Sequence, residues 1–394
     1  MQYNFDEVID RTQTDSAKWA RNRADSGVAD VIPMWVADMD FQSPAPVIQA
    51  LVRRAQHGIF GYPRRWDSYY DAITGWLHRR HGWDIQRDWI VNAPGVVNAL
   101  TLAIQALSKP GDKIVVQPPV YHPFYPIVQN HGRQIVLNPL RWENQRYVMD
   151  LENLERQIDG RTKLLILCNP HNPVGRVWTR AELEALGEFC ARHNLLILSD
   201  EIHCDLILRE HRHTPIAALS DELAQRTLTF IAPSKTFNLA GLATSVVIAP
   251  NEKLRAELSR TIEDYGLHIG NVFGIRALEA GYREGEEWLD QLLVYLEGNV
   301  RFAVRFIEER IPRIKPICPE GTYLLWLDCR ALGLDRAALN TLMRQKARVA
   351  LQDGADFGIG GEGFQRLNFA CPRSILEQGL ARIEAAVNQT SEIC

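Results

Sequence analysis

A lysine within an apolar segment is the feature of this chain that most directly suggests chemistry. Lys235 stands in APSKTFN (232–238), immediately after the apolar run TLTFIA (227–232). Burial disfavours the charged ammonium form and lowers its pKa, so a lysine in such a place can become a free amine that attacks an aldehyde or removes a proton. A solvated loop lysine is the alternative interpretation.

Two consecutive acids follow another apolar run. Asp200 and Glu201 stand in SDEIH (199–203), directly after LLIL (195–198). Open α/β sheets bind ligands at the carboxyl ends of their strands. A carboxylate there can keep a pyridine nitrogen protonated, and the resulting cation withdraws electrons from a carbanion. For Glu201, a surface turn with the acid facing water is the alternative interpretation.

Two turns could present further polar groups to a ligand. In NPHNPVG (169–175), prolines and a glycine fix a rigid turn, from which Asn172 could donate a hydrogen bond to a phenolate oxygen. The stretch NAPGVV (92–97) opens a predicted helix, whose free backbone N–H groups and positive dipole end favour a phosphate. The second motif is weak by itself.

A glycine-rich stretch near the C-terminus resembles a dinucleotide-binding pattern. GIGGEG (358–363) matches G-x-G-x-x-G, but no helix is predicted after it, and the loop runs into the strand-like QRLNF (365–369). We therefore reject a dinucleotide site. Arg366 in that strand is the better candidate, because a guanidinium group binds a carboxylate with two hydrogen bonds. A surface arginine is the alternative.

The cysteines favour neither disulfides nor a metal site. There are seven, an odd number without a C-x-x-C pair, so we expect reduced and mostly buried thiols. One cluster combines cysteine and histidine, but its spacing matches no known ligand pattern, and no metal is expected there. Its members are His203, Cys204, His211 and His213.

Composition describes an ordinary globular protein. Of 394 residues, 46% are hydrophobic and 23% charged, with a formal net charge of -4, so a large core is possible and no basic surplus suggests nucleic acid. The opening residues are acidic and polar, unlike a signal peptide. The apolar runs are too short to cross a membrane. A cytoplasmic location is expected.

Hydrophobic periodicity predicts an α/β fold with two domains. Residues 46–290 alternate helical patterns with β-branched runs, which favours a large domain with a mostly parallel sheet covered by helices on both faces. A helix is predicted over 179–193, with Thr179 as N-cap and Glu182 completing a capping box. The six strands expected in this sheet are 113–117, 134–138, 163–168, 195–200, 227–232 and 244–249.

The pattern changes after residue 290. A long helix, two strand-like runs at 323–327 and 366–369, and a closing helix from Arg373 predict a smaller α/β domain. The turn-rich residues 1–45 are expected to pack against it. The small domain would then be discontinuous, formed by 1–45 and 291–394.

Four motifs carry a family resemblance over nearly the whole chain. NPHNPVG, SDEIH, SKTFN and RLNFACPR occur in the order and approximate spacing of the class I/II aminotransferase superfamily, fold type I of the pyridoxal-phosphate enzymes. More narrowly, the chain resembles the bacterial MalY/PatB-type cystathionine β-lyases. The segments that carry this second resemblance are WVADMDF (35–41), FGYP (60–63), PVYHPFY (119–125) and SDEIHCD (199–205).

The resemblance implies a cofactor, pyridoxal 5'-phosphate. Lys235 would hold it as a Schiff base, Asp200 would pair with its pyridinium nitrogen, and Tyr121 would stack on its ring. These three residues would also be the catalytic ones. The other implied cofactor contacts are Gly95, Val96, Val97 and Ser234 near the phosphate, Asn172 and His203 at the phenolic oxygen, and Tyr62 supplied by the other subunit of a homodimer.

The resemblance also implies a substrate site and a reaction. Arg366 would hold the α-carboxylate of an amino acid, and Asn172, Tyr62 and Asp38 would line the same site, although no chemical role is evident for Asp38. β-Elimination of L-cystathionine or related cysteine S-conjugates would give a thiol, such as homocysteine, with pyruvate and ammonia.

Two other functions stay open from the sequence. An aminotransferase acting on a small or aromatic amino acid would share the early steps, and a regulatory protein could keep the fold and bind a partner. Aminotransferases commonly place a phosphate-binding arginine eight residues after the lysine, where this chain has Ala243. The β-lyases share that loss, so the lyase interpretation is unaffected.

Overall fold

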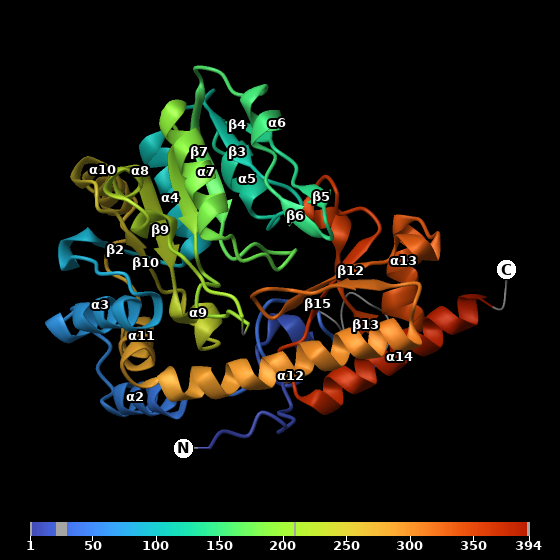
Figure 1. Cartoon of the computed structure of the whole chain (residues 1–394). Helices are drawn as coiled ribbons and strands as arrows, with labels where there is room; N and C mark the ends of the chain where they lie inside the picture. The colour runs from blue at the N-terminus through green and yellow to red at the C-terminus, as the bar shows by residue number, and fades with distance from the viewer. Residues whose placement is uncertain (1, 21–29, 209, 392–394) are drawn as a thin grey trace.

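A seven-stranded sheet is the centre of the computed structural model, which describes residues 2–20, 30–208 and 210–391 (Figure 1). Its spatial order is β2-β10-β9-β8-β7-β3-β4. The strands from β9 to β4 are parallel, whereas β10 runs antiparallel to both β2 and β9. The bounds are β2 (Ile90–Ala93), β3 (Lys113–Val116), β4 (Gln134–Leu137), β7 (Thr162–Cys168), β8 (Leu196–Asp200), β9 (Thr227–Ile231) and β10 (Ser245–Ile248).

The prediction of a mostly parallel α/β sheet is confirmed. All six predicted strands are present in it, and only β2 was not predicted. Helices cover both faces because successive side chains of a strand point to opposite sides. On β7, Leu164 and Ile166 belong to the core under α4, α5 and α10, whereas Leu165 and Leu167 belong to the core under α6, α7 and α8.

The covering helices are short to medium in length. Two of them, α4 and α7, lie against opposite faces of the sheet and begin beside the strand ends. Their bounds are α4 (Val96–Leu107), α5 (Phe124–Gln129), α6 (Leu151–Glu155), α7 (Arg180–Arg192), α8 (Asp221–Arg226), α9 (Pro233–Thr236) and α10 (Glu252–Asp264).

The capping box predicted for α7 is confirmed. The Thr179 hydroxyl accepts a hydrogen bond from the backbone N–H of Glu182, and the Glu182 carboxylate accepts one from the backbone N–H of Thr179. The same carboxylate also pairs with buried Arg176 at 2.8 Å. The Glu182 carboxylate therefore links the start of α7 to Arg176, which follows β7 in the chain.

The C-terminal part contains a four-stranded antiparallel sheet of order β11-β12-β15-β14. The predicted long helix, two strands and closing helix are all confirmed. The bounds are β11 (Lys315–Ile317), β12 (Leu324–Asp328), β14 (Gln352–Asp353), β15 (Phe364–Asn368), α12 (Glu286–Arg310), α13 (Arg336–Thr341) and α14 (Arg373–Ser391). As predicted, the G-x-G-x-x-G stretch lies in turns that lead into β15, and no helix follows it.

The N-terminal residues lie against this C-terminal part. β1 (Ile32–Pro33) pairs with β13 (Val349–Ala350) in parallel, and the hydroxyl of Tyr295 on α12 donates to Asp6. This contact supports the expectation that residues 1–45 pack with the second half. The division into a large domain, 46–290, and a discontinuous small domain stays a prediction.

Three helices form a further group at the start of α12 (Figure 1). α2 (Ala45–Gln56) and α3 (Asp67–His81) both pack on α11 (Val272–Glu284). The remaining elements are the hairpin β5 (Arg141–Glu143) and β6 (Arg146–Val148), and the short turns η1 (Arg87–Trp89), η2 (Ile216–Ala218), η3 (Ala240–Leu242), η4 (Arg330–Leu332), η5 (Leu342–Lys346) and η6 (Gly354–Phe357). Among the described residues, no helix combines the length and apolar character needed to cross a membrane.

We predict that Thr179→Ala lowers the free energy of unfolding by about 1 kcal/mol, because the N-cap acceptor is lost. Urea unfolding of the cofactor-free protein, followed by tryptophan fluorescence, measures the change. Thr179→Ser keeps the acceptor and is the matched control. Equal stability of the two variants would contradict the capping role.

Candidate active site

A cavity of about 290 Å³ lies at the carboxyl ends of β7, β8 and β9. It receives side chains from the turns after these strands, from the start of α4 and from the N-terminal segment, so distant parts of the sequence meet there. The residues that line it are Ala37, Gly95, Val96, Val97, Asn98, Tyr121, Cys168, Asn172, Asp200, Ile202, His203, Ser234, Lys235, Ala240, Ala243 and Thr244. All the cofactor contacts expected from the sequence are among them, except Tyr62.

Lys235 enters the cavity from α9, the single helical turn that follows β9. Its Nζ donates to the backbone carbonyl of Ala37 at 2.5 Å. Burial lowers its pKa to about 8; Asp38 and Asp200 act against this lowering, and Arg366 adds to it. A free amine is therefore accessible near neutral pH, which a solvated lysine would not offer.

Asp200 is the last residue of β8 and is buried. Its Oδ1 accepts a hydrogen bond from the backbone N–H of Ile202 at 3.1 Å. Burial raises the pKa of its carboxyl to about 7, although that hydrogen bond and the charge of Lys235 lower it. A cationic nitrogen beside this carboxylate would compensate its burial.

The neighbouring acid has a different environment. Glu201 is 1% exposed, accepts from His213 Nε2 at 2.8 Å and from the Ser199 hydroxyl at 2.7 Å. The alternative interpretation of Glu201 as a surface acid is therefore wrong. Its position is internal because β8 and the turn after it are covered on both sides.

Arg366 is a buried cation whose hydrogen bonds go only to neutral oxygens. Its Nη1 donates to Asn172 Oδ1 at 2.9 Å and its Nη2 to the Trp35 carbonyl at 2.7 Å, while Nε lacks a partner among the described residues. Burial lowers its pKa to about 10. Because no carboxylate in the described part of the chain pairs with this guanidinium group, it is suited to bind one from a ligand.

The start of α4 forms the anion-accepting end of the cavity. Gly95 is its N-cap with a φ of 94°, a conformation that favours glycine, and Val96 and Val97 supply free N–H groups of the first turn. Ser234 lies on the same lining. Ala243 also lines the cavity, and none of the described lining residues is an arginine.

His203 and Tyr121 complete the polar lining. His203 Nδ1 is buried without a hydrogen-bond partner among the described residues. Burial, with the charges of Lys235 and Arg366, holds the pKa of its imidazole well below the usual value, so the ring is neutral. Tyr121 presents a half-buried ring, and burial together with Asp200 raises the pKa of its hydroxyl.

The cavity fits pyridoxal phosphate. The helix start can accept its phosphate, Asp200 its ring nitrogen, and Lys235 its aldehyde. The unpaired Nδ1 of His203 is an orphaned polar atom that a ligand oxygen could satisfy. These assignments are inferred from the chemistry of the donors and acceptors.

Sequence reasoning missed the backbone of residues 35–41, which supplies several of the contacts. The carbonyl of Ala37 accepts from Lys235 and also from the Tyr323 hydroxyl at 2.8 Å, and the carbonyl of Trp35 accepts from Arg366. Backbone acceptors leave no signal in side-chain identity. The motif WVADMDF was noticed, but its contribution through main-chain oxygens was not predictable.

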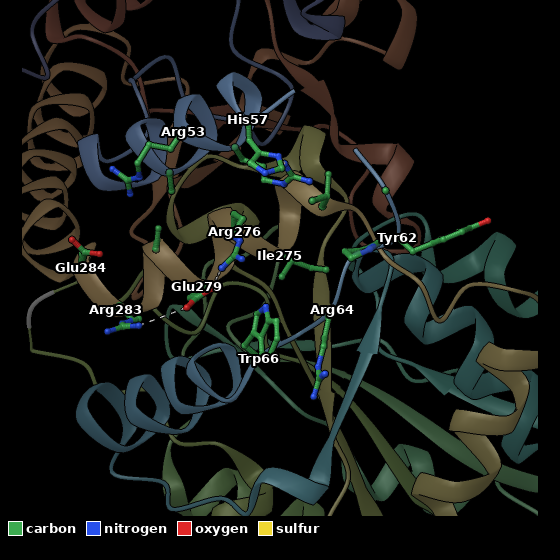
Figure 2. A pocket seen from close by; sticks show the side chains of 16 residues that line it. Arg53, His57, Tyr62, Arg64, Trp66, Ile275, Arg276, Glu279, Arg283 and Glu284 are labelled. Carbon is green, nitrogen blue, oxygen red and sulfur yellow. Dashed lines mark hydrogen bonds and ion pairs between the residues drawn. The ribbon is translucent and has the colours of Figure 1, made fainter. Parts of the chain in front are cut away.

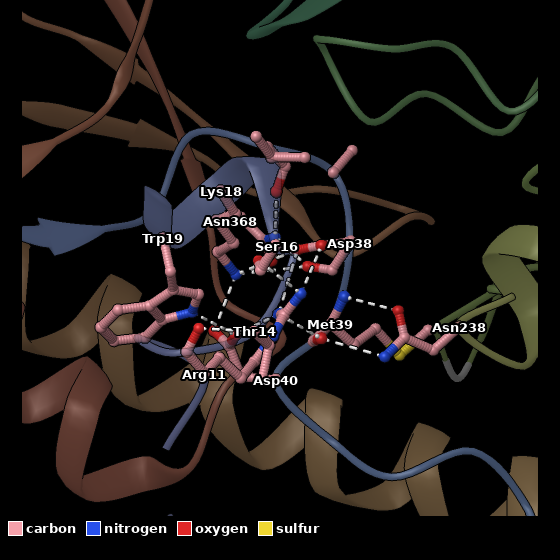
Figure 3. Close-up of polar contacts among 12 residues, drawn as sticks. Arg11, Thr14, Ser16, Lys18, Trp19, Asp38, Met39, Asp40, Asn238 and Asn368 are labelled. Atoms are coloured by element: carbon pink, nitrogen blue, oxygen red, sulfur yellow. Dashed lines mark hydrogen bonds and ion pairs between the residues drawn. The ribbon is translucent and has the colours of Figure 1, made fainter. Parts of the chain in front are cut away.

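Two asparagines hold this segment in place (Figure 3). Asn238 Nδ2 donates to the carbonyls of Met39 and Phe41, each at 3.0 Å, and Asn368 Nδ2 donates to those of Val36 and Asp38, each at 2.6 Å. Both asparagines stand in motifs read from the sequence, SKTFN and RLNF. Their presence in these motifs is the sequence feature that marks the two asparagines, although it predicts no role for either.

Asp38 is not among the residues that line the cavity, and its expected place at the substrate site stays a prediction. Its Oδ2 pairs with Arg11 at 2.8 Å, while the adjacent Asp40 pairs with Lys18 at 2.7 Å (Figure 3). These ion pairs turn the carboxylate of Asp38 toward the N-terminal segment. Its remaining influence on the cavity is electrostatic, through the pKa of Lys235.

The cysteine and histidine cluster does not form as a unit. His203 lines the cavity, and His213 is paired with Glu201. Cys204 instead lies within 4.8 Å of His81 and Asp205, a group that could in principle hold a metal. The Asp205 carboxylate already accepts hydrogen bonds from Trp76, His81 and Thr236, so we assign no metal there.

Tyr62 does not enter this cavity within one chain. It is 91% exposed, and it is not among the residues that line the cavity. The family resemblance implies that Tyr62 enters the cavity of a second subunit, and a single chain does not test that expectation.

Comparison with known proteins agrees with this geometry. The family described as "Aminotransferase class I and II" matches residues 29–383. The chain belongs to this family. Cystathionine beta-lyase PatB of Bacillus subtilis is 47% identical over 386 residues, which cover 98% of this chain and 100% of that protein.

Two solved structures of the family are similar to this chain. Cystalysin from Treponema denticola, which contains a pyridoxal 5'-phosphate cofactor, superposes with a TM-score of 0.96 at 36% identity and covers 99% of this chain and 100% of its own. The PLP-bound C-S lyase from Staphylococcus hominis has a TM-score of 0.90 at 31% identity, covering 98% of this chain and 99% of its own.

We predict that Asp200→Asn stabilises the cofactor-free protein at alkaline pH. The folded pKa of about 7 lies above the ordinary 3.8, so the native state loses stability as pH rises from about 4 to 7, and the loss is complete above 7. At about pH 9, where Lys235 with a pKa of about 8 is mostly neutral, the variant should be more stable by several kcal/mol.

Urea unfolding at about pH 4 and pH 9 measures this difference. The advantage of Asp200→Asn should be far smaller at the lower pH, where the folded wild-type carboxyl is protonated and the unfolded one is only about half ionised. Glu222→Gln, which changes an exposed acid, is the control. A variant no more stable than wild type at pH 9 would contradict the desolvation of Asp200.

Proposed function

We propose that the protein is a pyridoxal-phosphate-dependent carbon–sulfur β-lyase that acts on L-cystathionine or related cysteine S-conjugates. The observation that carries the proposal is that Lys235 and Asp200 line one cavity, with Arg366 hydrogen-bonded to Asn172 of the same lining. An amine, a carboxylate and a guanidinium group are thereby available to one amino-acid substrate. The near-full-length similarity to proteins named as cystathionine β-lyase and C-S lyase supports this choice within the family.

The cofactor would be held along the length of the cavity. Gly95, Val96, Val97 and Ser234 would seat its phosphate, and Asp200 would keep its ring nitrogen protonated. Tyr121 would lie against its ring, with Asn172 and His203 at its phenolic oxygen. When bound, pyridoxal phosphate supplies an electron-withdrawing ring that acidifies the Cα–H bond of an attached amino acid.

Arg366 would orient the substrate through its α-carboxylate. Its two hydrogen bonds to Asn172 and to the Trp35 carbonyl fix the guanidinium plane. Binding a carboxylate there also compensates a buried charge, so substrate binding is favoured electrostatically. With the carboxylate fixed, the Cα–H bond can be presented to Lys235.

Lys235 would act as the base that takes the Cα proton. Its lowered pKa lets it accept a proton and release it again near neutral pH. In β-elimination, the electron pair of the Cα–H bond forms the new Cα–Cβ π bond, and the Cβ–S bond breaks so that the sulfur leaves with its electron pair as thiolate. Water then releases ammonia and leaves pyruvate.

A homodimer would complete the site, with Tyr62 supplied by the other copy. Tyr62 lies on the rim of a groove of about 750 Å³ formed by α2, α11 and the loop between α2 and α3. Figure 2 shows its ring extending away from the other labelled side chains. Within one chain the side chain of Tyr62 is 91% exposed, so its ring is accessible to a second copy.

Several exposed apolar side chains stand in the loop that carries Tyr62 and in the loop 265–271. The loops 57–66 and 265–271 are in contact, because Arg65 donates to the His268 carbonyl. Phe60 also packs against Phe273 at the start of α11, with ring centroids 5.6 Å apart and the rings tilted. An exposed apolar patch of this kind favours a protein partner, and we assign it to a second copy. Its exposed members are Ile59, Phe60, Tyr62, Trp66, Tyr265, Leu267 and Ile269.

The location is proposed to be cytoplasmic. Six cysteines within the described part of the chain are free, and five of them are buried. Reduced, unpaired thiols are the normal state in the reducing cytoplasm.

We predict that the purified protein with pyridoxal phosphate releases pyruvate and an equal amount of thiol from L-cystathionine without any keto acid. Lactate dehydrogenase coupling and a thiol reagent measure the two products. Lys235→Ala should abolish both, which separates an enzyme from a purely regulatory protein. Turnover that requires a keto acid, with a new amino acid formed from it, would replace the lyase by an aminotransferase.

We predict that mixing two inactive variants restores activity. Lys235→Ala and Tyr62→Ala should each be poorly active, but a mixed dimer has one site with both residues intact if Tyr62 serves the other copy. Random reassociation should recover about a quarter of wild-type pyruvate release, since half of the dimers carry one good site. Recovery should fail if Tyr62 acts within its own chain.

A further inference from the structure

A second cavity, of about 440 Å³, lies beside the candidate active site. Six of its lining residues bear on its chemistry: Trp35, His122, Arg344, Gln352, Asp356 and Gln365. Trp35 and His122 stand in segments that carry the family resemblance, but no role was predicted for any of the six, and none belongs to the lining of the first cavity. The six residues come from the N-terminal segment, the loop before α5, and the C-terminal sheet with its connections.

Three chain segments form a common wall between the two cavities. Trp35 lines the second cavity while its carbonyl holds Arg366, and Ala37, two residues on, lines the first. His122 follows Tyr121, whose ring lines the first cavity. Gln352 is the register partner of Arg366 across β14 and β15 and therefore lies on the same face of that sheet.

The acids of the second cavity are already compensated. Asp356 accepts from Arg336 at 2.8 Å and from Gln352 at 2.5 Å. Asp353 also lines the cavity, and accepts from Arg336 at 2.6 Å and from Asn340 at 2.7 Å. One arginine thus serves both carboxylates, and their acceptor oxygens are occupied.

Arg344, unlike these two acids, has no compensating partner among the described residues. Its guanidinium group has neither a hydrogen bond nor an ion pair to any described residue, although it is half-buried. It projects from η5 (Leu342–Lys346), a π-helical turn that continues α13. Such turns are rare and are found frequently at functional sites. An uncompensated guanidinium group in a polar cavity favours an anionic ligand group.

For a substrate bound in the first cavity, the position of one group, the sulfur substituent on Cβ, has not yet been assigned. With its amine at the cofactor end and its α-carboxylate at Arg366, the Cβ–S substituent is the part of the substrate that can reach beyond the first cavity. Trp35 and His122 belong to those flanking segments and also line the second cavity. A long substituent that extends past these two residues would bring its far end to Arg344.

We propose that the second cavity binds the carboxylate at the far end of the departing thiol, with Arg344 as its binding group. The proposal rests on the β-lyase function above and names the preferred substrate class: cysteine S-conjugates whose thiol carries an anionic group, such as L-cystathionine. Arg344 acts on substrate selection and takes no part in breaking the C–S bond.

Two synthetic conjugates of equal length test the proposal. S-(2-carboxyethyl)-L-cysteine would release a thiol that bears a carboxylate, and S-(2-aminoethyl)-L-cysteine would release a thiol that bears an ammonium group. In Arg344→Gln, KM for the anionic conjugate should rise about tenfold, the loss expected for one charge-assisted hydrogen bond. Its kcat should be unchanged, because the reacting atoms lie at the first cavity.

Lys346→Gln is the matched control, since Lys346 stands in the same π-helical turn, is exposed and does not line the cavity. It should leave KM for both conjugates unchanged. Arg344→Glu should reverse the preference, raising KM for the anionic conjugate and lowering it for the cationic one. This gain would not follow from a merely damaged fold.

The outcomes separate this proposal from the one on which it rests. If wild-type protein releases pyruvate from both conjugates but Arg344→Gln and Arg344→Glu change KM for them equally or not at all, the anion site is wrong and the lyase stands. If wild-type protein releases pyruvate from neither conjugate nor from L-cystathionine, the lyase function itself fails.

Discussion

Burial of charge without full compensation is the constraint on which the candidate site depends. Asp200 and Arg366 are buried and Lys235 is partly buried, and none of the three has an oppositely charged side chain as a hydrogen-bond partner among the described residues. Such groups are costly to bury unless a ligand completes their pairing. The protein therefore keeps a cavity whose walls favour a molecule with an anion, a cationic ring nitrogen and a carboxylate.

The rest of the fold supports these unpaired charges with neutral hydrogen bonds. Main-chain carbonyls of residues 35–41 accept from Lys235, Arg366 and Tyr323, and two asparagines clamp that segment from either side. One asparagine follows the lysine loop of the parallel sheet, and the other belongs to the antiparallel sheet. The segment thus joins the two sheets at the point where the cavity lies.

The two cavities would recognise different parts of the substrate. The first holds groups that any amino-acid substrate of the family would need, because amine, Cα–H and carboxylate are common to all of them. In the second, Arg344 would meet the part of the substrate that lies beyond the sulfur. Chemistry and selection would then rest on different elements, the strand ends of the large sheet and the π-helical turn near the small one.

Much of the fold and site could be predicted from the sequence. Near-continuous apolar runs identified six of seven strands, because a sheet covered on both faces leaves no alternation. Lys235, Asp200 and Asn172 were recognisable because each directly follows an apolar strand or lies one turn beyond it. The short strand β2, IVNA, was missed because four residues next to a helix start give little periodic signal.

Tertiary structure decided what side-chain identity does not encode. That Glu201 is internal and paired with His213, that Asp38 turns toward Arg11, and that carbonyls of residues 35–41 face Lys235 and Arg366 all depend on contacts between segments far apart in the chain. Local patterns fix which residues form a strand or a turn. Only packing fixes which charges lose water, and through that desolvation it sets their pKa values and their capacity to bind a ligand.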